Sequence, residues 1–401
     1  MRVPSRLQVS GPLAEYADGF REELLGQGYQ QTSAANHLYL LAHMSRWMVN
    51  QGFNTAELTP ARVEEFLRAR RADGYVIRLS QRGVAPLLGY LRGLGVVPTP
   101  PGSVSAAPVE LLVESYSNYL ASERGLAAGT VCRYASIARL FLSDCERPAG
   151  LDVGCLTAGD VTAFVVRHCR SRPVASAKML VTGLRSLLRF LLVEGYTDRH
   201  LAPAVLTTTG WAGGSLPQAL SPKAVAGLLA SCDQHTEVGL RDFAILTVLH
   251  RLGLRAGEVA TLALADVDWR HGEIVVRGKG SRRERLPLPA DVGEAMVAYL
   301  HQRRRSACRT LFLRVRAPIG GLTSDGVADA VRGACLRSGL PSAGPHRLRH
   351  SAATAMVAGG ATLAGVGQVL RHARLATTAI YAKVDRTSLR SLARPWPGGA
   401  R

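Results

Sequence analysis

The residues of this chain best suited to chemistry lie near its C-terminal end. Pro345 is suited to the first position of a helix and the pair Gly359-Gly360 to its end, which predicts one helix over this stretch. His346, Arg349 and His350 then fall within the first turn and a half. Because His346 and Arg349 are three residues apart, they share one face of the helix.

A second group follows shortly after this helix. Thr362 is suited to cap a second helix that continues through Leu370, and His372 comes just after it. Tyr381 lies nine residues beyond His372, on a short third segment. The sequence therefore predicts imidazole, guanidinium and phenol groups within one compact helical unit.

The net charge of the chain indicates what this unit acts on. The 401 residues carry a formal charge of +19, and residues 217–401 contribute +14 of it, with 27 basic against 13 acidic residues. The charge of residues 1–100 is only +3 and that of residues 101–216 only +2. Such a basic region is suited to a polyanion, and nucleic acid is the commonest one, although an arginine-rich proteome is the alternative source of the charge.

A phosphodiester substrate gives each of these side chains a use. Attack on phosphorus places negative charge on the non-bridging oxygens, which guanidinium groups stabilise well because each can hold two oxygens. Arg255 and Arg349 are the candidates for this role. A tyrosine can act as the nucleophile and conserve the bond energy in a phosphotyrosine ester, so that the strand is rejoined without ATP. Tyr381 is the candidate nucleophile.

The leaving alkoxide needs a proton, which a lysine can supply and an arginine cannot. The chain has four lysines against 45 arginines, so a lysine retained among arginines indicates a role that requires proton release. Lys279 is such a residue, in the turn between the two strands predicted at 273–277 and 284–288. The alternative is an ordinary charged turn residue.

The histidines allow two interpretations. His346 could accept or relay the proton of the phenol, and His372 could donate to a phosphate oxygen. The alternative is a zinc site, because His346 and His350 stand four apart and His372 could be a third ligand. No glutamate follows His346, and Arg349 would place a positive charge beside the metal, so we expect neither a metal nor a cofactor.

The rest of the chain is organised to position these residues. Its length predicts two or three domains. Residues 15–96 have mostly helical periodicity, a Pro- and Ser-rich linker follows at 97–103, and a Gly-rich linker lies near 207–214. Two sequence matches, 58–66 with 156–164 and 87–95 with 187–195, have offsets of about 100, which predicts a duplicated helical domain; the alternative is that capped helix starts recur by chance.

Seven scattered cysteines, without a C-x-x-C pair, fit neither a disulfide framework nor a zinc ribbon, and we expect reduced thiols. No apolar run approaches the ~20 residues that a membrane-spanning helix needs, and the first ten residues lack the apolar core of a signal peptide. These features predict a cytosolic protein, and with the expected DNA target one associated with the nucleoid.

Taken together, the motifs resemble the catalytic domain of the tyrosine recombinases, the phage-integrase and Xer-type family. The resemblance rests on an ordered set over roughly 130 residues. The set consists of G-L-R-A-G-E-V-A-T-L at 253–262, V-R-G-K-G-S-R-R-E-R-L-P-L at 276–288, H-R-L-R-H at 346–350, and a histidine nine residues before a tyrosine.

The resemblance implies a fold, an activity and a set of residue roles. The fold would be mainly α with a small β-sheet: an N-terminal helical domain at 1–100 that duplicates the core-binding fold, a SAM-like helical core-binding domain at 108–203, and a mixed α+β catalytic domain at 216–396. The last two would clamp duplex DNA. The activity would be site-specific strand cleavage and rejoining through a 3′-phosphotyrosyl link. The implied catalytic residues are Arg255, Lys279, His346, Arg349, His372 and Tyr381, with Glu258 and His350 in support.

The implied partner is double-stranded DNA carrying recombination sites, bound by a homotetramer on paired sites. Accessory DNA-bending proteins or sister recombinases are further possible partners, and the segment 386–392 would dock in a neighbouring subunit. The predicted DNA contacts are Arg277, Arg282, Arg283, Arg285 and Arg371. Two departures from the family stand out: Arg371 occupies a position that is usually glycine, and residues 1–96 do not resemble the β-rich arm-binding domain of phage integrases.

Three biological roles fit the sequence: the integrase of a phage or integrative element, the transposase of a mobile element, and a housekeeping Xer-like resolvase. The extra N-terminal domain favours a mobile element. Two other classes remain as alternatives: an inactive DNA-binding protein with the same fold, and a type IB topoisomerase, which would share the chemistry but act as a monomer.

Overall fold

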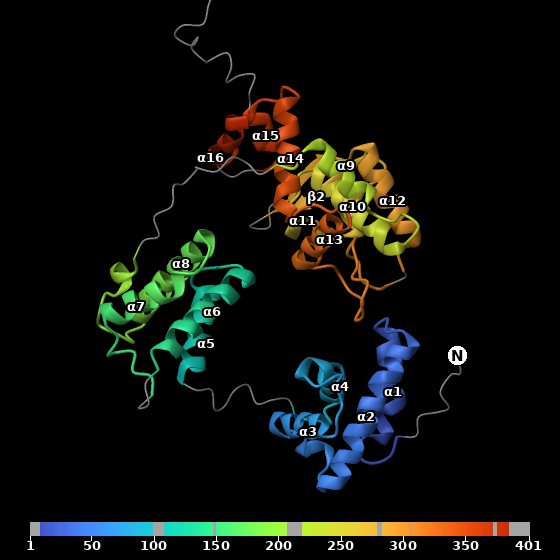
Figure 1. Ribbon diagram of the computed structural model, residues 1–401, viewed down its shortest axis with the longest axis vertical. Coiled ribbons are helices and arrows are strands. Elements are labelled where there is room, and N and C mark those ends of the chain that lie inside the picture. Colours follow the sequence, from blue (N-terminus) through green and yellow to red (C-terminus); the bar gives the residue numbers. More distant parts are fainter. Residues whose placement is uncertain are drawn as a thin grey trace, which may run out of the picture. The chain divides into compact units, whose positions relative to one another are not determined.

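The structure is a computed structural model, and it describes residues 9–98, 108–146, 150–206, 219–278, 283–304, 306–371 and 375–384. Helices make up most of it (Figure 1). Contacts divide the chain into two compact units, residues 98–212 and residues 1–97 with 213–401. Buried apolar side chains form one cluster within residues 13–97, another within 109–205, a third within 225–348 and a small fourth within 353–381.

The first block consists of four helices around the cluster of residues 13–97. These are α1 (Ala17–Gly26), α2 (Gln31–Gln51), α3 (Pro60–Ala72) and α4 (Gln81–Gly93), with short 3-10 turns at Ala14–Tyr16 and Thr55–Glu57. The hydroxyl of Thr59 accepts a hydrogen bond from the backbone N–H of Arg62, which caps α3. Phe20, Met44, Phe66 and Leu91 are completely buried between the helices.

The second block also consists of four helices: α5 (Pro108–Ser122), α6 (Ala128–Asp144), α7 (Ala158–Cys169) and α8 (Val174–Val193), followed by a 3-10 turn at Ala202–Ala204. Thr157 and Asp160 cap the start of α7 reciprocally. Gly183 allows α6 to approach α8 closely, because a Cβ atom there would lie 2.7 Å from the Ile137 Cδ1 atom.

The positions matched by the sequence repeat have the same environment in both blocks. Val63 and Phe66 are buried three residues apart on α3. Val161 and Phe164 are buried with the same spacing on α7. Each of these helices begins directly after a capping threonine. Equal burial and capping at an offset of 98 support the duplication, which stays a prediction, as do the three domain boundaries.

The remaining described residues build a mixed structure around the helix α10 (Glu237–Arg251). Its neighbours are α9 (Pro222–Ala230), α12 (Ala290–Gln302), α13 (Ser324–Arg337) and α14 (Pro345–Ala358). Because apolar residues occupy nearly every face of α10, all its residues from Leu240 to Leu249 are buried except the partly buried Phe243. The chain continues from α14 through α15 (Leu363–Val369) and α16 (Leu375–Thr378) to a 3-10 helix, η5, at Ala379–Val384.

A three-stranded antiparallel sheet lies beside α11 (Ala256–Thr261), after a 3-10 turn at Leu264–Asp266. Its order is β1 (Val267–Asp268), β2 (Glu273–Arg277) and β3 (Arg283–Pro287), with Val275 opposite Arg285. Ile274 and Val276 of β2 face the core, while alternate residues are more exposed. The fold predicted from the sequence, mainly α with a small sheet in the catalytic part, is confirmed.

A glycine joins α10 to the segment that carries the candidate site. Gly253 has a φ of +57°, and a Cβ atom at this position would lie 2.6 Å from the Leu370 Cδ2 atom. The residue therefore needs both the left-handed conformation and the missing side chain. Within the described ranges, no helix has the length and apolar character required to cross a membrane.

Candidate active site

The phenol of Tyr381 lies against the imidazole of His350. The Nδ1 atom of His350, on α14, is 2.8 Å from the Tyr381 hydroxyl oxygen, on the 3-10 helix η5. Tyr381 is only 1% exposed and packs with Ala353, Val357 and Leu370. Burial raises the pKa of Tyr381, partly offset by the positive charge of Arg349. The phenol is therefore neutral near pH 7, and a nucleophilic oxygen requires a proton acceptor beside it.

His350 is protonated less readily than a free histidine. Burial lowers the pKa of His350, and the nearby His346 and Arg349 lower it further. A neutral imidazole near pH 7 can accept the phenol proton at Nδ1. The sequence predicted that His346 could accept or relay this proton, whereas in the structure the imidazole bonded to the phenol belongs to His350.

Arg349 connects α14 to two other segments. Its side chain is buried and donates hydrogen bonds to the backbone carbonyl oxygens of Gly253 and Leu370. Burial, followed by the charges of Arg255 and Arg371, lowers the pKa of Arg349 to about 10. The guanidinium still carries its charge at neutral pH, and its orientation is fixed by the two carbonyls.

Arg255 lies at the N-terminal cap of α11 and is paired with Glu258. Its Nη1 atom is 2.7 Å from Glu258 Oε1, and its backbone N–H donates to Glu258 Oε2 at 2.8 Å. The Arg255 side chain is 39% exposed, while that of Glu258 is 5% exposed. Burial opposes ionisation of Glu258, but hydrogen bonds from Arg255 and the charge of Arg371 keep its pKa below the usual value. A buried carboxylate thus orients a guanidinium that remains open to a ligand.

His346 lies one turn before His350, at the start of α14, and is exposed on one side. Partial desolvation lowers the pKa of His346, and Arg349 and then Arg255 add to this effect. The sensitivity to both arginines indicates that His346 belongs to the same electrostatic neighbourhood. A neutral imidazole here can hydrogen-bond to a phosphate oxygen.

The structure places five of the predicted site residues in one group: Arg255 is bonded to Glu258 and His350 to Tyr381, while Arg349 is bonded to backbone carbonyl oxygens between them. Leu370 and Arg371 join the two halves of this group, because their carbonyl oxygens accept hydrogen bonds from Arg349 and Arg255, the latter at 3.4 Å. Lys279, Arg282 and His372 lie outside the described residues, so their roles stay predictions.

The described arginines predicted to contact DNA have different environments. Arg277 pairs with Asp266 at 2.8 Å and Arg285 with Glu273 at 3.2 Å, and both guanidiniums are at least 45% exposed. Arg283 is exposed at the start of β3. These three remain candidates for phosphate contacts because their side chains are exposed, although the partner of Arg277, Asp266, is buried.

The environment of Arg371 differs from that expected of a DNA contact. Its side chain is only 3% exposed, and its Nη2 atom lies 2.7 Å from Glu258 Oε2. A guanidinium that is buried and already paired with a carboxylate does not present itself to a DNA backbone. The sequence-based assignment of Arg371 as a DNA contact is therefore not supported, because the residue binds an internal carboxylate instead.

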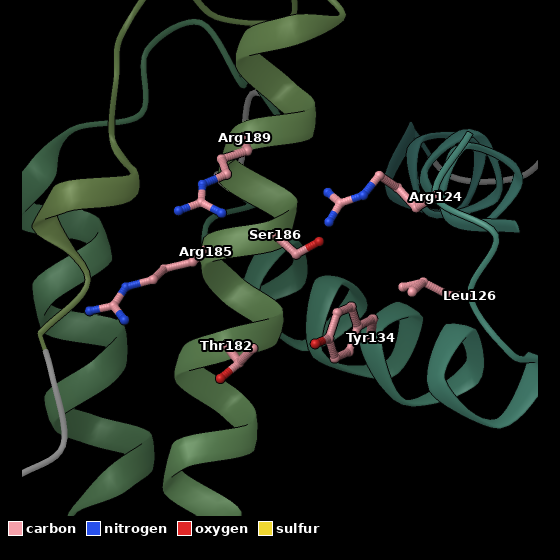
Figure 2. Close-up of a pocket in the computed structure, with 7 residues that line it drawn as sticks. All are labelled: Arg124, Leu126, Tyr134, Thr182, Arg185, Ser186 and Arg189. Carbon is pink, nitrogen blue, oxygen red and sulfur yellow. The ribbon is translucent and has the colours of Figure 1, made fainter. Parts of the chain in front are cut away.

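The second block contains a basic hollow of about 310 Å³ that the sequence analysis did not find. It lies between α6, α8 and the connection from α5 to α6, with Arg185 and Arg189 on α8 (Figure 2). Figure 2 shows Arg124 reaching from that connection toward Ser186. The lining residues are Arg124, Leu126, Tyr134, Thr182, Arg185, Ser186 and Arg189, none of which is acidic. The i, i+4 spacing of Arg185 and Arg189 was the available signal.

The described residues contain no group of three or more His, Cys, Asp and Glu side chains arranged to hold a metal ion. His372, the third ligand in the zinc alternative, lies outside the described part. Of the other two candidate ligands, His350 is bonded to the Tyr381 phenol through Nδ1.

The mainly helical fold with a small sheet thus carries a group of arginine, histidine and tyrosine side chains. The phage integrase family model matches residues 218–388. The chain is also 38% identical over 400 residues to the putative integrase/recombinase y4rA of Sinorhizobium fredii (strain NBRC 101917 / NGR234), covering 97% of this chain and 96% of that protein. The chain belongs to the tyrosine recombinase family, whose members cleave and rejoin DNA strands.

Relatives named XerD match a smaller part of the chain. The tyrosine recombinase XerD of Mycobacterium tuberculosis (strain ATCC 25618 / H37Rv) is 31% identical over 308 residues, covering 72% of this chain and 96% of XerD. Among solved structures, the XerH site-specific recombinase bound to palindromic difH substrate has a TM-score of 0.55 at 20% identity, covering 74% of this chain and 91% of that one. A lambda integrase (75–356) dimer bound to a COC′ core site has a TM-score of 0.53 at 18% identity, covering 72% and 97%. These two structures share the fold.

Proposed function

We propose that this protein is the site-specific recombinase of a mobile element, with Tyr381 as its nucleophile. The Tyr381 oxygen attacks a scissile phosphate, its proton passes to His350, and the bond from phosphorus to the 5′ oxygen breaks. The leaving 5′ oxygen takes a proton from Lys279. The products are a 3′-phosphotyrosyl link and a free 5′-hydroxyl, and attack by a 5′-hydroxyl from a second site reverses the sequence of steps.

The remaining site residues stabilise the charge that develops on the phosphate. Arg255 and Arg349 hold the non-bridging oxygens, and His346 and His372 donate hydrogen bonds to them. No hydrolysis is needed, because the energy of the broken bond is kept in the tyrosyl ester. The step therefore needs neither ATP nor a metal-bound water.

One observation carries this proposal. Tyr381, on η5, is bonded to α14 through His350, while Leu370 and Arg371, which follow α15, accept hydrogen bonds from Arg349 and Arg255. The nucleophile and its proton acceptor are thus bonded to each other, and both guanidiniums are bonded to the backbone of the segment that leads to the nucleophile. The exposed Arg255 guanidinium leaves a place for the phosphate at this cluster.

The test uses a duplex that contains the inverted repeats flanking the gene and a nick beside the scissile position. After cleavage, the short strand diffuses away and the covalent protein–DNA adduct accumulates. The wild type should form this adduct and Tyr381→Phe should not, while both bind the duplex equally. Tyr299→Phe is the matched control, since Tyr299 is equally buried and is the other tyrosine after residue 216. An adduct that persists in Tyr381→Phe rules out this nucleophile.

The proposed role in a mobile element is supported by how much of this chain its relatives cover. The integrase/recombinase y4rA matches 97% of this chain, whereas XerD relatives match 70–74% of it. A housekeeping resolvase needs no additional N-terminal block. Recombination between two marked copies of the flanking repeats supports the mobile-element role, and simple relaxation of a supercoiled plasmid without recombination would instead indicate a topoisomerase.

We further propose that four copies assemble on two paired DNA sites. The N-terminal domain at 1–100 duplicates the core-binding fold but carries little of the net charge, so it extends the clamp or contacts a neighbouring copy rather than gripping phosphates strongly. Removal of residues 1–100 should weaken pairing of sites more than binding to one site. Removal of 386–401, which lie outside the described residues, should leave single-site binding intact and reduce tetramers, as counted by mass photometry. Undiminished tetramers from both truncations would exclude both contacts.

The basic hollow of the 108–203 core-binding domain is a proposed contact of this clamp with the DNA backbone. Arg124, Arg185 and Arg189 surround it together with hydroxyl groups of Thr182, Ser186 and Tyr134, a combination suited to phosphate oxygens. Loss of one such contact should weaken binding to all sequences and reduce the salt dependence of binding. Accessory DNA-bending proteins and a location at the nucleoid follow from the proposed role.

A further inference from the structure

Arg371 is an unusual residue for its conformation and its surroundings. Its φ is +56°, in the left-handed region, where a residue with a side chain is disfavoured relative to glycine. Its side chain is 3% exposed, so a positive charge is also removed from water. Both features are unfavourable on their own, and they persist only where surrounding contacts compensate for them.

The left-handed turn at Arg371 presents backbone carbonyls to both site arginines. The carbonyl oxygen of Leu370 accepts a hydrogen bond from Arg349, and the carbonyl oxygen of Arg371 lies 3.4 Å from Arg255 Nη2. Two consecutive carbonyls therefore orient the two guanidiniums that are proposed to hold the phosphate. A glycine would make this backbone turn more easily, so the turn alone does not explain the arginine.

The contacts of the Arg371 side chain explain why an arginine stands here and not a glycine, because Arg371 and Arg255 bind the same carboxylate, that of Glu258. Glu258 Oε2 accepts from Arg371 Nη2 at 2.7 Å and from the Arg255 backbone N–H at 2.8 Å, while Glu258 Oε1 accepts from Arg255 Nη1 at 2.7 Å. The Nε atom of Arg371 is also 3.9 Å from Glu284 Oε2, in the hairpin that carries Lys279.

The charges of this group decide what the second arginine does. Arg255 and Glu258 alone sum to zero, so Glu258 would neutralise the guanidinium that has to stabilise a phosphate. With Arg371 on the same carboxylate, the group of Arg255, Glu258 and Arg371 has a net charge of +1, and the charge of Glu284 offsets it less because that side chain is farther from Arg371 and 44% exposed to water. Since only the Arg255 side chain is substantially exposed, this charge is available to a ligand through Arg255.

We propose that Arg371 is a positioning residue for strand cleavage, which acts by neutralising Glu258 so that Arg255 keeps its positive charge for the scissile phosphate. This inference rests on the proposed function of Arg255 and Tyr381. Arg371 itself touches neither the DNA nor the nucleophile, and its effect passes through Glu258.

The experiment measures the rate of adduct formation on the nicked duplex at saturating protein. Arg371→Gly keeps the left-handed turn and removes the guanidinium, and we expect it to slow adduct formation about 10- to 100-fold, by analogy with the loss that follows when the outer partner of a metal ligand is removed. DNA affinity should be unchanged. Arg371→Lys retains the charge and should be slowed less. The matched control is Arg78→Gly, which removes the chain's other described left-handed arginine and should not change the rate.

Two readouts separate this role from a general structural one. In the double variant Glu258→Gln with Arg371→Gly, the group regains a net charge of +1, so the rate should rise above that of Arg371→Gly. A methylphosphonate at the scissile position removes one negative charge from the substrate, so the defect of Arg371→Gly should shrink on this substrate. If Arg371→Gly merely damaged the fold, the double variant would be slower still, or the defect of Arg371→Gly would be equal on the phosphate and methylphosphonate substrates.

The outcomes distinguish this inference from the proposed function. If the wild type forms the Tyr381 adduct and Arg371→Gly matches its rate, the inference is wrong and the proposed function stands. A double variant slower than Arg371→Gly, with an equal defect on both substrates, also overturns it. If the wild type forms no adduct through Tyr381, the proposed function fails, and the inference fails with it.

Discussion

The imidazole of His350 and the phenol of Tyr381 form a hydrogen-bonded pair 31 residues apart in sequence, with Nδ1 2.8 Å from the hydroxyl oxygen. Their pKa values are displaced in opposite directions by burial, down for His350 and up for Tyr381. Near pH 7 both groups are therefore neutral, and in the imidazole tautomer that carries its proton on Nε2 the phenol O–H donates to Nδ1. This is the arrangement from which a proton can move to the imidazole as the tyrosine attacks.

The first prediction concerns this proton transfer. His350→Asn keeps a hydrogen-bond acceptor near the phenol but cannot take its proton, and we expect adduct formation to slow by roughly two or more orders of magnitude. The wild-type rate should fall at acid pH, because an imidazolium cannot accept the phenol proton. Since the pKa of His350 is lowered, this fall should begin below about pH 6.5, the pKa of a free histidine. Rapid-quench measurement of the adduct from pH 5 to 9 follows both effects.

His346→Asn provides the comparison, because His346 is the acceptor that the sequence predicted. If His346→Asn removes the acid limb of the pH profile while His350→Asn reacts at the wild-type rate, then His346 accepts the proton and the contact with His350 only holds the phenol in place.

Local pattern was sufficient for much of the fold. The strands β2 and β3 were predicted within a residue because short runs with β-branched and alternating residues flank a Gly-containing turn. The start of α14 followed from Pro345, and the limits of α15 from the capping Thr362 and Leu370. The two-residue strand β1 was missed, since its pairing with β2 depends on a neighbour and not on its own sequence.

The internal contacts of the site could be predicted only in part. Residue types and order predicted Arg255, Arg349 and Tyr381 as site residues, and their catalytic roles stay predictions. The pairing of Glu258 with Arg371, 113 residues away, arises from tertiary packing and has no periodic signal. The positive φ of Arg371 is likewise set by its surroundings, because nothing local distinguishes this arginine from an exposed one. Arg371 was therefore assigned to DNA when it binds a carboxylate.

The second prediction concerns Lys279, which lies outside the described residues. Lys279→Arg keeps the charge but removes a releasable proton, so adduct formation should fall by roughly two or more orders of magnitude. A 5′-phosphorothiolate substrate, whose sulfur leaves without protonation, should restore much of the rate. An arginine variant that stays slow on this substrate would show that Lys279 does something other than donate a proton. Lys223→Arg, in α9, is a control with the same substitution.

The third prediction concerns metal ions and nucleotides. The sequence has no G-x-x-x-x-G-K-[ST] motif for a nucleotide phosphate, and the proposed charge stabilisation comes from guanidiniums. Strand cleavage and rejoining should therefore proceed in EDTA and without ATP, as measured by adduct formation and by recombinant product. Loss of cleavage in EDTA that zinc restores would instead favour the zinc interpretation of His346, His350 and His372.

The last prediction concerns the stability of the N-terminal block. His37, on α2, is 6% exposed and packs edge-on against the rings of Phe20 and Tyr29, and in the described part its Nδ1 atom has no hydrogen-bond partner. Burial, with a smaller contribution from Arg78, lowers the pKa of His37 to about 4. As the pH falls, His37 therefore binds a proton in the unfolded chain, where its pKa is near 6.5, at a higher pH than in the folded chain.

The sign of the pH effect follows from this order of protonation. The block has its full stability above about pH 6.5 and loses stability as the pH falls from there toward 4, by on the order of 2 kcal/mol at pH 5. His37→Leu cannot titrate, so its free energy of unfolding should change less between pH 7.5 and pH 5 than that of the wild type. Urea denaturation followed by tryptophan fluorescence measures the difference, with Trp47 as the reporter in this cluster. The subtraction removes the contributions of the other histidines, which both proteins share. An equal loss in both proteins would show that His37 is protonated equally in the folded and unfolded states.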